Sequence, residues 1–305
     1  MCEFGIGYCW LFLITCHGRS AASPNRNQGS RIYEFAWARP QQFYLDSRRK
    51  PFQAVAVLAP TNCAAVIPCF NESASLTALV AAVRRQLPSV MVVDDGSTDG
   101  TNRLAENAGA FVLKHDSNLG KGAALQTGLS HALRQHFEWA VTLDGDGQHA
   151  PEDLPALWQR AQDTGASLVI GNRMHEAQKM PWLRRRVNRW MSRQISRRAG
   201  RLLPDTQSGF RLIHLPTWAA LRFNTKHFEI ESEMLMAFLA AGRRVEFVPI
   251  QVMPSRRRSH IHPVADTLRW WRWWRKFCRL PATRSPAISS LNPKLPAAAQ
   301  TEMLR

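Results

Sequence analysis

The sequence predicts an α/β protein built on a doubly wound, mostly parallel sheet that is flanked by helices. From residue 63 onward, short apolar runs alternate with helical segments, an order that produces parallel strands joined by crossover helices. Two of these runs end directly in carboxylates, at Asp94-Asp95 and at Asp144-Gly145-Asp146. Ligands of open α/β sheets bind beyond the carboxyl ends of the strands, so we expect a nucleotide-type site along this edge.

Six short apolar runs, each bounded by turn-forming residues, are the expected strands. They cover residues 64–67, 89–93, 110–113, 139–143, 168–171 and 210–213. Pro68 is expected to end the first strand, because proline cannot donate a hydrogen bond to the sheet.

The helices between these strands are marked by residues that favour helix starts. The first helix opens at residues 71–73, and Ser97, Thr98 or Asp99 can cap the second. The third follows the glycine-containing loop at residues 120–122. Repetition of this strand, loop and helix unit is what favours a parallel sheet.

The carboxylates after the fourth strand indicate a divalent metal ion. Asp144 and Asp146 lie on one side if the strand continues, and the glycines let a bulky anion approach the backbone. Oxygen ligands from Asp144, Asp146 and Gln148 suit Mg²⁺ or Mn²⁺, which also bind diphosphate oxygens. An isolated Asp-Gly-Asp is more often an ordinary turn than a metal site, so this prediction depends on the rest of the chain.

Two further loops offer groups for a nucleotide. Asp95 can accept hydrogen bonds from a ribose hydroxyl or a base N–H, whereas Asp94 is as compatible with a simple helix start. Lys121, in the loop before the third helix, puts a cation near backbone N–H groups that suit phosphate. The loop lacks the P-loop pattern GxxxxGK[ST], which argues against a Walker-type ATPase.

The chain is strongly basic, and its charge is concentrated. Lys+Arg 40 against Asp+Glu 23 gives +17, and residues 173–201 and 256–279 together hold 16 of these 17 charges. Such clustering indicates an anionic partner, which can be a nucleic acid, an acidic lipid or a phosphorylated substrate. Nucleic acid is the less favoured partner, because the aromatic and basic residues fall on helical stripes and not in a base-stacking groove.

The ends of the chain and its cysteines indicate where in the cell the protein is found. The apolar run at residues 4–14 is too short to span a bilayer and lacks the charged start of a signal peptide, although a membrane anchor there is an open alternative. We expect residues 1–60 to be a disordered extension or an over-long gene model, and residues 281–305 a disordered tail. The six cysteines form no CxxC pair, and we expect reduced thiols in a cytosolic protein.

Four motifs follow one another along the chain. They are residues 66–72 (VIPCFNE), 92–101 (VVDDGSTDGT), 120–122 (GKG) and 143–149 (LDGDGQH). In this order they resemble glycosyltransferase family 2, and within it most closely the dolichyl-phosphate mannose synthase group of polyprenyl-phosphate glycosyltransferases. The resemblance implies a single catalytic domain of GT-A fold at residues 61–262, a basic tryptophan-rich helix at residues 263–280, and a nucleotide-activated sugar as donor.

The resemblance also assigns residues to the donor. It implies that Pro68, Phe70, Glu72, Val93 and Asp95 hold the nucleoside. Phenylalanine departs from the more usual tyrosine of this group at its position, which removes a hydroxyl but keeps a stacking face.

A second set of residues is implied for the transfer. Asp144 and Asp146 would hold the metal and the diphosphate, with Asp146 essential for catalysis, and Arg173 and Arg185 would contact an acceptor phosphate. Glu231 stands where many family members that act on hydroxyl acceptors keep a catalytic base, although it can also be a plain helix-start acid. A hydroxyl must lose a proton as it attacks, whereas a phosphate monoester is already anionic, so the role of this glutamate depends on the acceptor.

Two basic helices are expected at a membrane surface. Residues 182–197 carry an apolar stripe surrounded by arginines, and residues 270–279 carry a tryptophan face. For the first helix, a solvated face over an ordinary core stripe is an equal alternative. We therefore expect a peripheral enzyme on the inner, cytoplasmic face of the cytoplasmic membrane.

Taken together, the sequence predicts an inverting, metal-dependent transfer of a sugar from a nucleoside diphosphate sugar to a membrane-bound acceptor, with a polyprenyl phosphate favoured. The alternative is a family 2 enzyme that acts on a hydroxyl of a lipid or of a cell-envelope glycan. The expected cofactor is Mg²⁺ or Mn²⁺. The sequence leaves open the sugar, the nucleotide, the identity of the acceptor and the oligomeric state.

Overall fold

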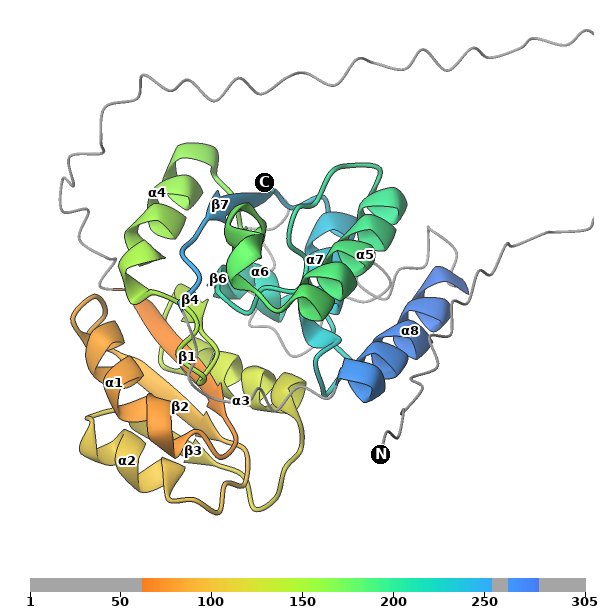
Figure 1. Ribbon diagram of the computed structural model, residues 1–305. Coiled ribbons are helices and arrows are strands. Elements are labelled where there is room, and N and C mark those ends of the chain that lie inside the picture. Colours follow the sequence, from red (N-terminus) through yellow and green to blue (C-terminus); the bar gives the residue numbers. More distant parts are fainter. Residues whose placement is uncertain (1–61, 254–262, 280–305) are drawn as a thin grey trace, which may run out of the picture. The chain divides into compact units, whose positions relative to one another are not determined.

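The computed structural model describes residues 62–253 and 263–279, which form one seven-stranded sheet covered by helices (Figure 1). The predicted N-terminal extension and C-terminal tail lie outside the described residues. The boundaries proposed for the catalytic domain therefore stay predictions.

The sheet is mixed and mostly parallel, with the strand order β3-β2-β1-β4-β6-β5-β7. Its strands are β1 (Cys63–Cys69), β2 (Val90–Asp94), β3 (Phe111–Lys114), β4 (Trp139–Thr142), β5 (Leu168–Asn172), β6 (Arg211–His214) and β7 (Val245–Pro249). Strand β6 runs antiparallel to β4 and β5, and all the other pairs are parallel. The predicted fold class is confirmed, and all six expected strands are present; β7 was not expected.

Helices cover both faces of the sheet (Figure 1). The helices are α1 (Ser73–Arg84), α2 (Thr101–Asn107), α3 (Lys121–Arg134), α4 (Leu154–Thr164), α5 (Trp182–Ala199), α6 (Leu215–Ala219), α7 (Ile230–Ala240) and α8 (Pro263–Arg279), with two 3₁₀ helices, η1 (Pro151–Asp153) and η2 (Met174–Lys179). Side chains of α1, α2 and α4 enter one buried cluster. Those of α3, α5, α6, α7 and α8 enter another.

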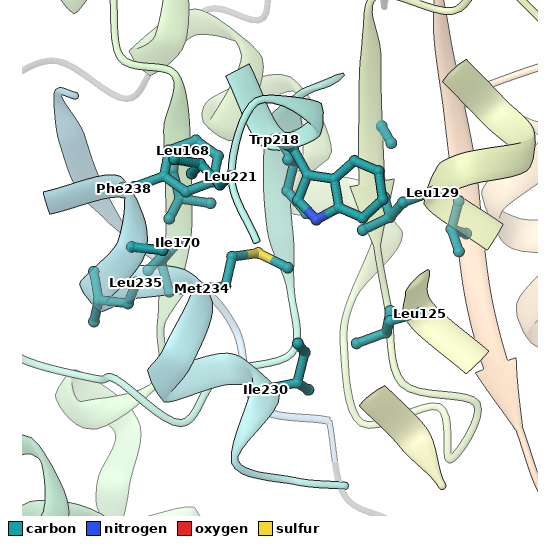
Figure 2. Close-up of a cluster of buried hydrophobic side chains, with 14 of the residues drawn as sticks. Leu125, Leu129, Leu168, Ile170, Trp218, Leu221, Ile230, Met234, Leu235 and Phe238 are labelled. Carbon is teal, nitrogen blue, oxygen red and sulfur yellow. The ribbon is translucent and has the colours of Figure 1, made fainter. Parts of the chain in front are cut away.

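Strand β1 supplies both clusters because successive side chains of a strand point to opposite faces. Ala65 and Ile67 join the cluster of α1, α2 and α4, whereas Ala64 and Val66 join the other. Figure 2 shows part of this second cluster, where Trp218 of α6 lies among leucines of α3 and residues of α7. A strand that is apolar on both faces is what a doubly covered parallel sheet requires.

Pro68 does not end β1, which corrects the expectation from the sequence. The strand continues to Cys69, and Pro68 pairs with Val93 of β2. The N–H of Ala65 bonds toward β2, so even-numbered residues of β1 turn their amides toward β4. Strand β4 pairs with β1 only as far as Val66. An N–H at position 68 would point toward β4 beyond the end of its pairing with β1, so the proline removes no hydrogen bond of the sheet.

The antiparallel direction of β6 determines what lies at the functional edge. Thr142, at the end of β4, pairs with Arg211, at the start of β6. The loop that precedes β6, residues 205–210, is thereby brought to the edge where β1, β2 and β4 end. Thr142 Oγ1 donates a hydrogen bond of 2.7 Å to the carbonyl of Gly209 and fastens this loop to β4.

Candidate active site

The loops after β1 and β2 are tied together by side chains. Asn71 has a left-handed φ of 56°, which asparagine tolerates because its short polar side chain bonds locally. Its Oδ1 accepts a 2.9 Å hydrogen bond from the backbone N–H of Thr98. Its own N–H donates to Ser97 Oγ, also at 2.9 Å. The motif at residues 66–72 is thus held against the motif at residues 92–101.

Asp99 serves the starts of two helices. The N-cap position of α2 is Gly100 and not Ser97, Thr98 or Asp99, but of these three residues Asp99 does bond the start of the helix. The Asp99 carboxylate accepts hydrogen bonds of 3.1 Å from the N–H of Thr101 and from the N–H of Ser73, the first residues of α2 and α1. Although its slight burial acts in the opposite direction, these bonds lower the pKa of Asp99 to about 2.

Asp95, predicted to hold the nucleoside, is buried and braces the loop before α3. Its Oδ1 accepts from Leu119 N at 2.9 Å and lies 2.7 Å from His115 Nδ1. Its Oδ2 accepts from Gly120 N at 2.8 Å, and His115 Nε2 lies 3.0 Å from Thr127 Oγ1. A carboxylate oxygen can accept two hydrogen bonds, so Oδ2 has capacity for one more donor such as a base N–H. Nucleoside binding by Asp95 stays a prediction.

Asp94, the last residue of β2, is fully buried. Its Oδ1 accepts a 2.9 Å hydrogen bond from the N–H of Ser97, which turns the chain after the strand. Its Oδ2 is buried and has no hydrogen-bond partner among the described residues. A buried acceptor without a hydrogen-bond partner lowers the stability of the fold. We therefore expect this oxygen to be protonated or to bind a water molecule or a ligand.

The remaining residues predicted at the nucleoside lie at the ends of the same two strands. Pro68 and Val93 are register partners and are buried. Phe70 and Glu72 follow β1 and are half-buried. Gly145 packs so closely here that a Cβ atom on it would lie 3.3 Å from Glu72 Cγ. The structure thus brings the predicted nucleoside residues next to the predicted metal motif.

Asp144 and Asp146 follow β4 at this edge. Asp144 Oδ1 lies 2.6 Å from Lys121 Nζ, and its Oδ2 lies 3.9 Å from His149 Nε2. Asp146 Oδ1 accepts a 3.0 Å hydrogen bond from the N–H of Gln148, which closes the turn. Oδ1 of each carboxylate therefore has a protein partner closer than 3.1 Å. Oδ2 of each has no partner that close within the described chain.

Gln148, the third predicted metal ligand, is already engaged. Its side-chain Oε1 accepts a 2.9 Å hydrogen bond from Arg184 Nη1. Its backbone carbonyl accepts a 3.1 Å bond from the N–H of Met253. An ion that took Gln148 Oε1 as a ligand would have to displace a guanidinium group, so this ligand stays a prediction.

The two carboxylates fit a hard divalent ion that arrives with its substrate. Within residues 62–253 and 263–279, no group of three or more His, Cys, Asp or Glu side chains is arranged to hold a metal. Mg²⁺ is commonly held by one or two carboxylates together with substrate phosphates and water. Asp144 and Asp146 match that mode, whereas a permanent metal cage would need more ligands.

Lys121, the first residue of α3, bridges two acidic side chains. Its Nζ lies 2.6 Å from Asp144 Oδ1 and 2.5 Å from Glu231 Oε1. Burial acts against its charge, but the two carboxylates prevail and raise the pKa of Lys121. In the same way Lys121 overcomes the effect of burial and lowers the pKa of Asp144. The predicted phosphate-binding lysine is thus the cation that holds the metal motif and the candidate base together.

Glu231, at the start of α7, is buried and is also fixed through its backbone. Its carbonyl accepts a 2.7 Å hydrogen bond from Arg211 Nη1. Arg211 is 1% exposed, and its other bonds go to the carbonyls of Ser208 and Thr206. Burial lowers the pKa of Arg211 to about 10, although the carboxylates of Glu231 and Asp205 act in the opposite direction. This arginine clamps the loop before β6 to the residue that carries the candidate base.

Arg173, the predicted phosphate ligand, is buried in a two-pronged pair with Asp205. Nε donates to Asp205 Oδ2 at 2.8 Å and Nη2 donates to Oδ1 at 3.0 Å. The backbone N–H of Arg173 adds a third bond of 3.1 Å. Despite burial, which acts in the opposite direction in each case, the pairing raises the pKa of Arg173 and lowers the pKa of Asp205. Nη1 makes no hydrogen bond to a described residue and is the part of Arg173 that is left for a ligand.

Arg184 and Arg185, which are neighbours on α5, have different surroundings in the structure. Arg184 is half-buried and reaches Gln148, and burial lowers its pKa, an effect that the positive charge of Arg173 increases. The side chain of Arg185, the residue predicted for the acceptor phosphate, makes no hydrogen bond or ion pair with a described residue, and its backbone N–H donates to the carbonyl of Pro181. The role of Arg185 stays a prediction, and Arg184 is the arginine of this helix that the fold brings to the metal motif.

Two more residues support the metal motif and escaped the sequence analysis. His149 is buried, stacks on Phe210 with ring centroids 5.4 Å apart, and lies beneath Asp144. Burial lowers the pKa of His149 even though nearby carboxylates act in the opposite direction. Gly209 lies against Asp144 so closely that any side chain there would overlap the carboxylate. The histidine belongs to the motif at residues 143–149 and the glycine to the loop before β6, but contact with Asp144 was predicted for neither residue.

The predicted interfacial helix α5 combines core and surface residues. Met191 and Ile195 of its apolar stripe are buried, as the core interpretation requires. Trp182 and Leu183 are 64% and 45% exposed, and Trp190 is 40% exposed. The exposed arginines of this helix are Arg186, Arg189, Arg193, Arg197 and Arg198. The core interpretation is therefore confirmed for the buried residues of the stripe, and a membrane-surface role of the exposed part stays a prediction.

None of the helices in the described part of the chain is both long and apolar enough to cross a bilayer. Cys63, Cys69 and Cys278, the three cysteines that fall within the described ranges, are free thiols.

An open α/β sheet with buried carboxylates and cations at its carboxyl edge is the arrangement of a nucleotide-dependent α/β enzyme. The family model described as glycosyl transferase family 2 matches residues 64–217, and the chain belongs to this family. It is therefore a glycosyltransferase, as the four motifs predicted.

Similar proteins carry related names. The undecaprenyl-phosphate mannosyltransferase of Micrococcus luteus is 32% identical over 204 residues, which cover 61% of this chain and 81% of that protein. The polyprenol monophosphomannose synthase of Mycolicibacterium smegmatis is 39% identical over 127 residues, or 39% of this chain and 48% of that protein. The predicted resemblance to the polyprenyl-phosphate group is thus confirmed.

Solved structures share the fold. Glucosyl-3-phosphoglycerate synthase from Mycobacterium tuberculosis superposes with a TM-score of 0.61 at 21% identity and covers 72% of this chain and 80% of that one. A second crystal structure of that enzyme, with Mn²⁺, UDP and phosphoglyceric acid, gives 0.59 at 22% identity, with 72% and 79% covered. The GT-A arrangement predicted from the motifs is confirmed at the level of the fold.

Proposed function

We propose that this glycosyltransferase moves a sugar from a nucleoside diphosphate sugar to a polyprenyl phosphate, with inversion at the transferred carbon. The observation that carries the proposal is the ion pair between Lys121 and Glu231, 2.5 Å long. A carboxylate held by an ammonium group at this distance is poorly placed to remove a proton from a hydroxyl acceptor. A phosphate acceptor needs no base, because its oxygen is already charged.

The cations of the site suit an anionic acceptor. Arg173 and Arg184 approach the metal motif from two elements, the end of β5 and helix α5. Arg173 keeps Nη1 for a phosphate oxygen while Asp205 fixes the rest of its guanidinium group. A guanidinium held in place in this way loses less freedom on binding than a mobile surface side chain does. Relatives whose names specify undecaprenyl phosphate and polyprenol support the same class of acceptor.

The donor would lie across the ends of β1, β2 and β4. Phe70 offers a stacking face to the base, and Asp95 Oδ2 offers an acceptor for a base or ribose donor. Asp144 and Asp146 would hold Mg²⁺ or Mn²⁺, which neutralises the charge that develops on the leaving diphosphate. Structural neighbours crystallised with UDP and Mn²⁺ or Mg²⁺ support this assignment.

Helix α5 would bring the enzyme to its lipid. Its exposed arginines suit anionic headgroups, and Trp182 and Leu183 suit the boundary between headgroups and acyl chains. Attachment to the inner face of the cytoplasmic membrane would place the active site beside a lipid-linked phosphate. The same surface would serve a lipid hydroxyl acceptor, so it does not separate the two acceptor classes.

The proposal is tested with a panel of UDP- and GDP-sugars, offered with undecaprenyl phosphate or with membrane extract freed of phosphate monoesters by phosphatase. We expect a glycosyl-phosphate product, identified by mass, from the first acceptor only. The configuration at the anomeric carbon, read by NMR, should be opposite to that of the donor. If product formed only with the phosphatase-treated extract, the proposed phosphate acceptor would be wrong and the acceptor would be a hydroxyl.

A further inference from the structure

Helix α8 is joined to the active site by a chain of hydrogen bonds that starts at one tryptophan. Trp270 is 2% exposed, although α8 is a strongly basic helix. Its indole Nε1 donates a 2.8 Å hydrogen bond to Ser232 Oγ on α7. Ser232 is fully buried and directly follows Glu231, the candidate base that Lys121 holds.

The chain continues into the loop before β6. Gln207 Nε2 donates to the same Ser232 Oγ at 2.9 Å and to Thr206 Oγ1 at 2.8 Å. Thr206 Oγ1 lies 3.1 Å from Ser192 Oγ of α5, and Ser192 Oγ accepts a 3.1 Å bond from the backbone N–H of Thr206. The loop between Asp205 and Arg211 is therefore held from α7 on one side and from α5 on the other.

The donor and acceptor roles in this chain are fixed by chemistry. An indole N–H can only donate, and both N–H groups of the Gln207 amide are used. Ser232 Oγ must therefore accept twice, which occupies both of its lone pairs. Removing the Trp270 bond leaves a buried acceptor partly unsatisfied, and the amide of Gln207 loses an oriented partner.

The loop that receives these bonds positions Arg173, the proposed phosphate ligand, and Glu231, the partner of Lys121. Asp205 holds the guanidinium of Arg173, and Thr206 accepts a bond from Arg211, which clamps Glu231. Within the described chain, Trp270, Ser232 and Gln207 make no hydrogen bond or ion pair with the metal motif. They act on the site through the loop.

Trp270 also packs against both basic helices. Its ring lies 5.4 Å from that of Trp190 on α5 in an edge-on contact, and 5.5 Å from Trp274 on its own helix in a stacked one. A displacement of α8 would therefore move the hydrogen bond to Ser232. The ring of the neighbouring Trp271 instead lies under the guanidinium group of Arg275, and its indole N–H donates no hydrogen bond to a described residue.

From these contacts we infer that Trp270 is a positioning residue, through which helix α8 sets the geometry of the Arg173 and Glu231 region by way of Ser232 and Gln207. The inference deepens the proposed function, because it concerns the same transfer site. It makes α8 part of the catalytic domain in function as well as in packing.

The first test is hydrogen exchange on the full chain without any substrate, so that it does not depend on the proposed acceptor. Trp270→Phe and Ser232→Ala should each speed exchange at the backbone amides of Thr206 and Gln207, by about three- to tenfold, the loss expected for one buried neutral hydrogen bond. Trp271→Phe is the matched control and should leave these amides unchanged. Melting temperatures and circular dichroism of all variants identify any that fail to fold.

The second test is a double-mutant cycle on transfer. Trp270→Phe and Ser232→Ala should each lower kcat by about three- to tenfold with little change in the KM for the donor, and the double variant should be no worse than the poorer single one. Independent, additive losses, or exchange at residues 206–207 that matches the Trp271→Phe control, would overturn the inference. A changed exchange pattern in an enzyme that does not glycosylate polyprenyl phosphate would refute the proposed acceptor and leave the positioning role supported.

Discussion

The ammonium nitrogen of Lys121 lies 2.5 Å from Oε1 of Glu231, so the residue predicted as a catalytic base is held by a cation. This contact supports the order of effects that a phosphate acceptor predicts, in which Arg173→Ala is more severe than Glu231→Gln. With a phosphate acceptor, Glu231→Gln removes a partner of Lys121 but no proton acceptor that the reaction needs. We expect a loss in kcat of less than about tenfold for Glu231→Gln, well below the 10²–10⁴ range of general base catalysis.

Arg173→Ala should be the more severe change. Loss of a charge-assisted contact costs about 1.5–3 kcal/mol, so transfer should slow by one to two orders of magnitude. Arg173→Lys should rescue only in part, because lysine cannot pair with Asp205 through two parallel bonds. Steady-state kinetics of the three variants with the identified acceptor provide the measurement. A near-normal Arg173→Ala beside an inactive Glu231→Gln would exclude the phosphate acceptor.

The pair of Arg173 and Asp205 predicts a dependence of stability on pH. Since the pKa of Asp205 is lowered in the folded state, its stabilising effect is complete above the unfolded-state pKa, about 3.9, and is lost as the pH falls through the lower folded-state value. Breaking a buried pair costs about 3–5 kcal/mol, so Asp205→Asn should be destabilised by that order near neutral pH.

Urea unfolding of wild type and Asp205→Asn at a series of pH values checks this prediction. The difference in the free energy of unfolding should be constant from about pH 8 to pH 5 and should shrink below about pH 4. If the difference in the free energy of unfolding instead grew as the pH fell, Asp205 would not be ionised in the folded state.

Gly209 predicts a way to disturb Asp144 without changing a charged group. Its backbone does not have the positive φ that would make glycine necessary, but a methyl group there would overlap the carboxylate of Asp144. Gly209→Ala should therefore weaken the binding of a nucleoside diphosphate in the presence of Mn²⁺. Calorimetric titration with UDP and GDP provides the readout. Unchanged affinity would show that the carboxylate can move without cost.

The metal motif predicts that donor binding requires a divalent ion. Asp146→Asn should abolish turnover, because the amide removes one of the two carboxylates that suit the ion, while the fold is retained. Circular dichroism and the melting temperature serve as controls for the fold. Full activity of the wild-type enzyme in excess EDTA would contradict the metal-dependent mechanism.

The basic face of α5 predicts binding to anionic vesicles. Each cation near such a surface contributes about 1 kcal/mol, so replacing the exposed Arg186, Arg189 and Arg193 by glutamine should weaken binding roughly a hundredfold at low salt. Vesicle flotation measures the loss, and high salt should reduce the binding of the wild type.

A matched variant removes the same charge from other helices. Arg85, Arg103 and Arg134 are exposed on or beside α1, α2 and α3, and their replacement by glutamine should change vesicle binding much less. Equal losses from both triple variants would mean that net charge, and not this face of α5, attracts the enzyme to the membrane.

Local sequence determined the order of the strands and helices and the carboxylates that follow β2 and β4. These features depend on runs of a few residues: apolar strands, glycine turns and helix starts. Helical periodicity also marked the apolar stripe of residues 182–197, of which Met191 and Ile195 are buried in the structure. The family likeness could be read from motifs for the same reason, because each motif is a continuous stretch of chain.

Only the tertiary structure decided which charged groups meet. Lys121 and Glu231 are 110 positions apart, and Arg173 reaches Asp205 because the antiparallel strand β6 returns its preceding loop to the edge where β5 ends. On α5, adjacent residues point about 100° apart, so a small rotation of the helix decides whether Arg184 or Arg185 faces the metal motif. Helix rotation is determined by packing against distant residues, and a pattern within the helix itself cannot specify it.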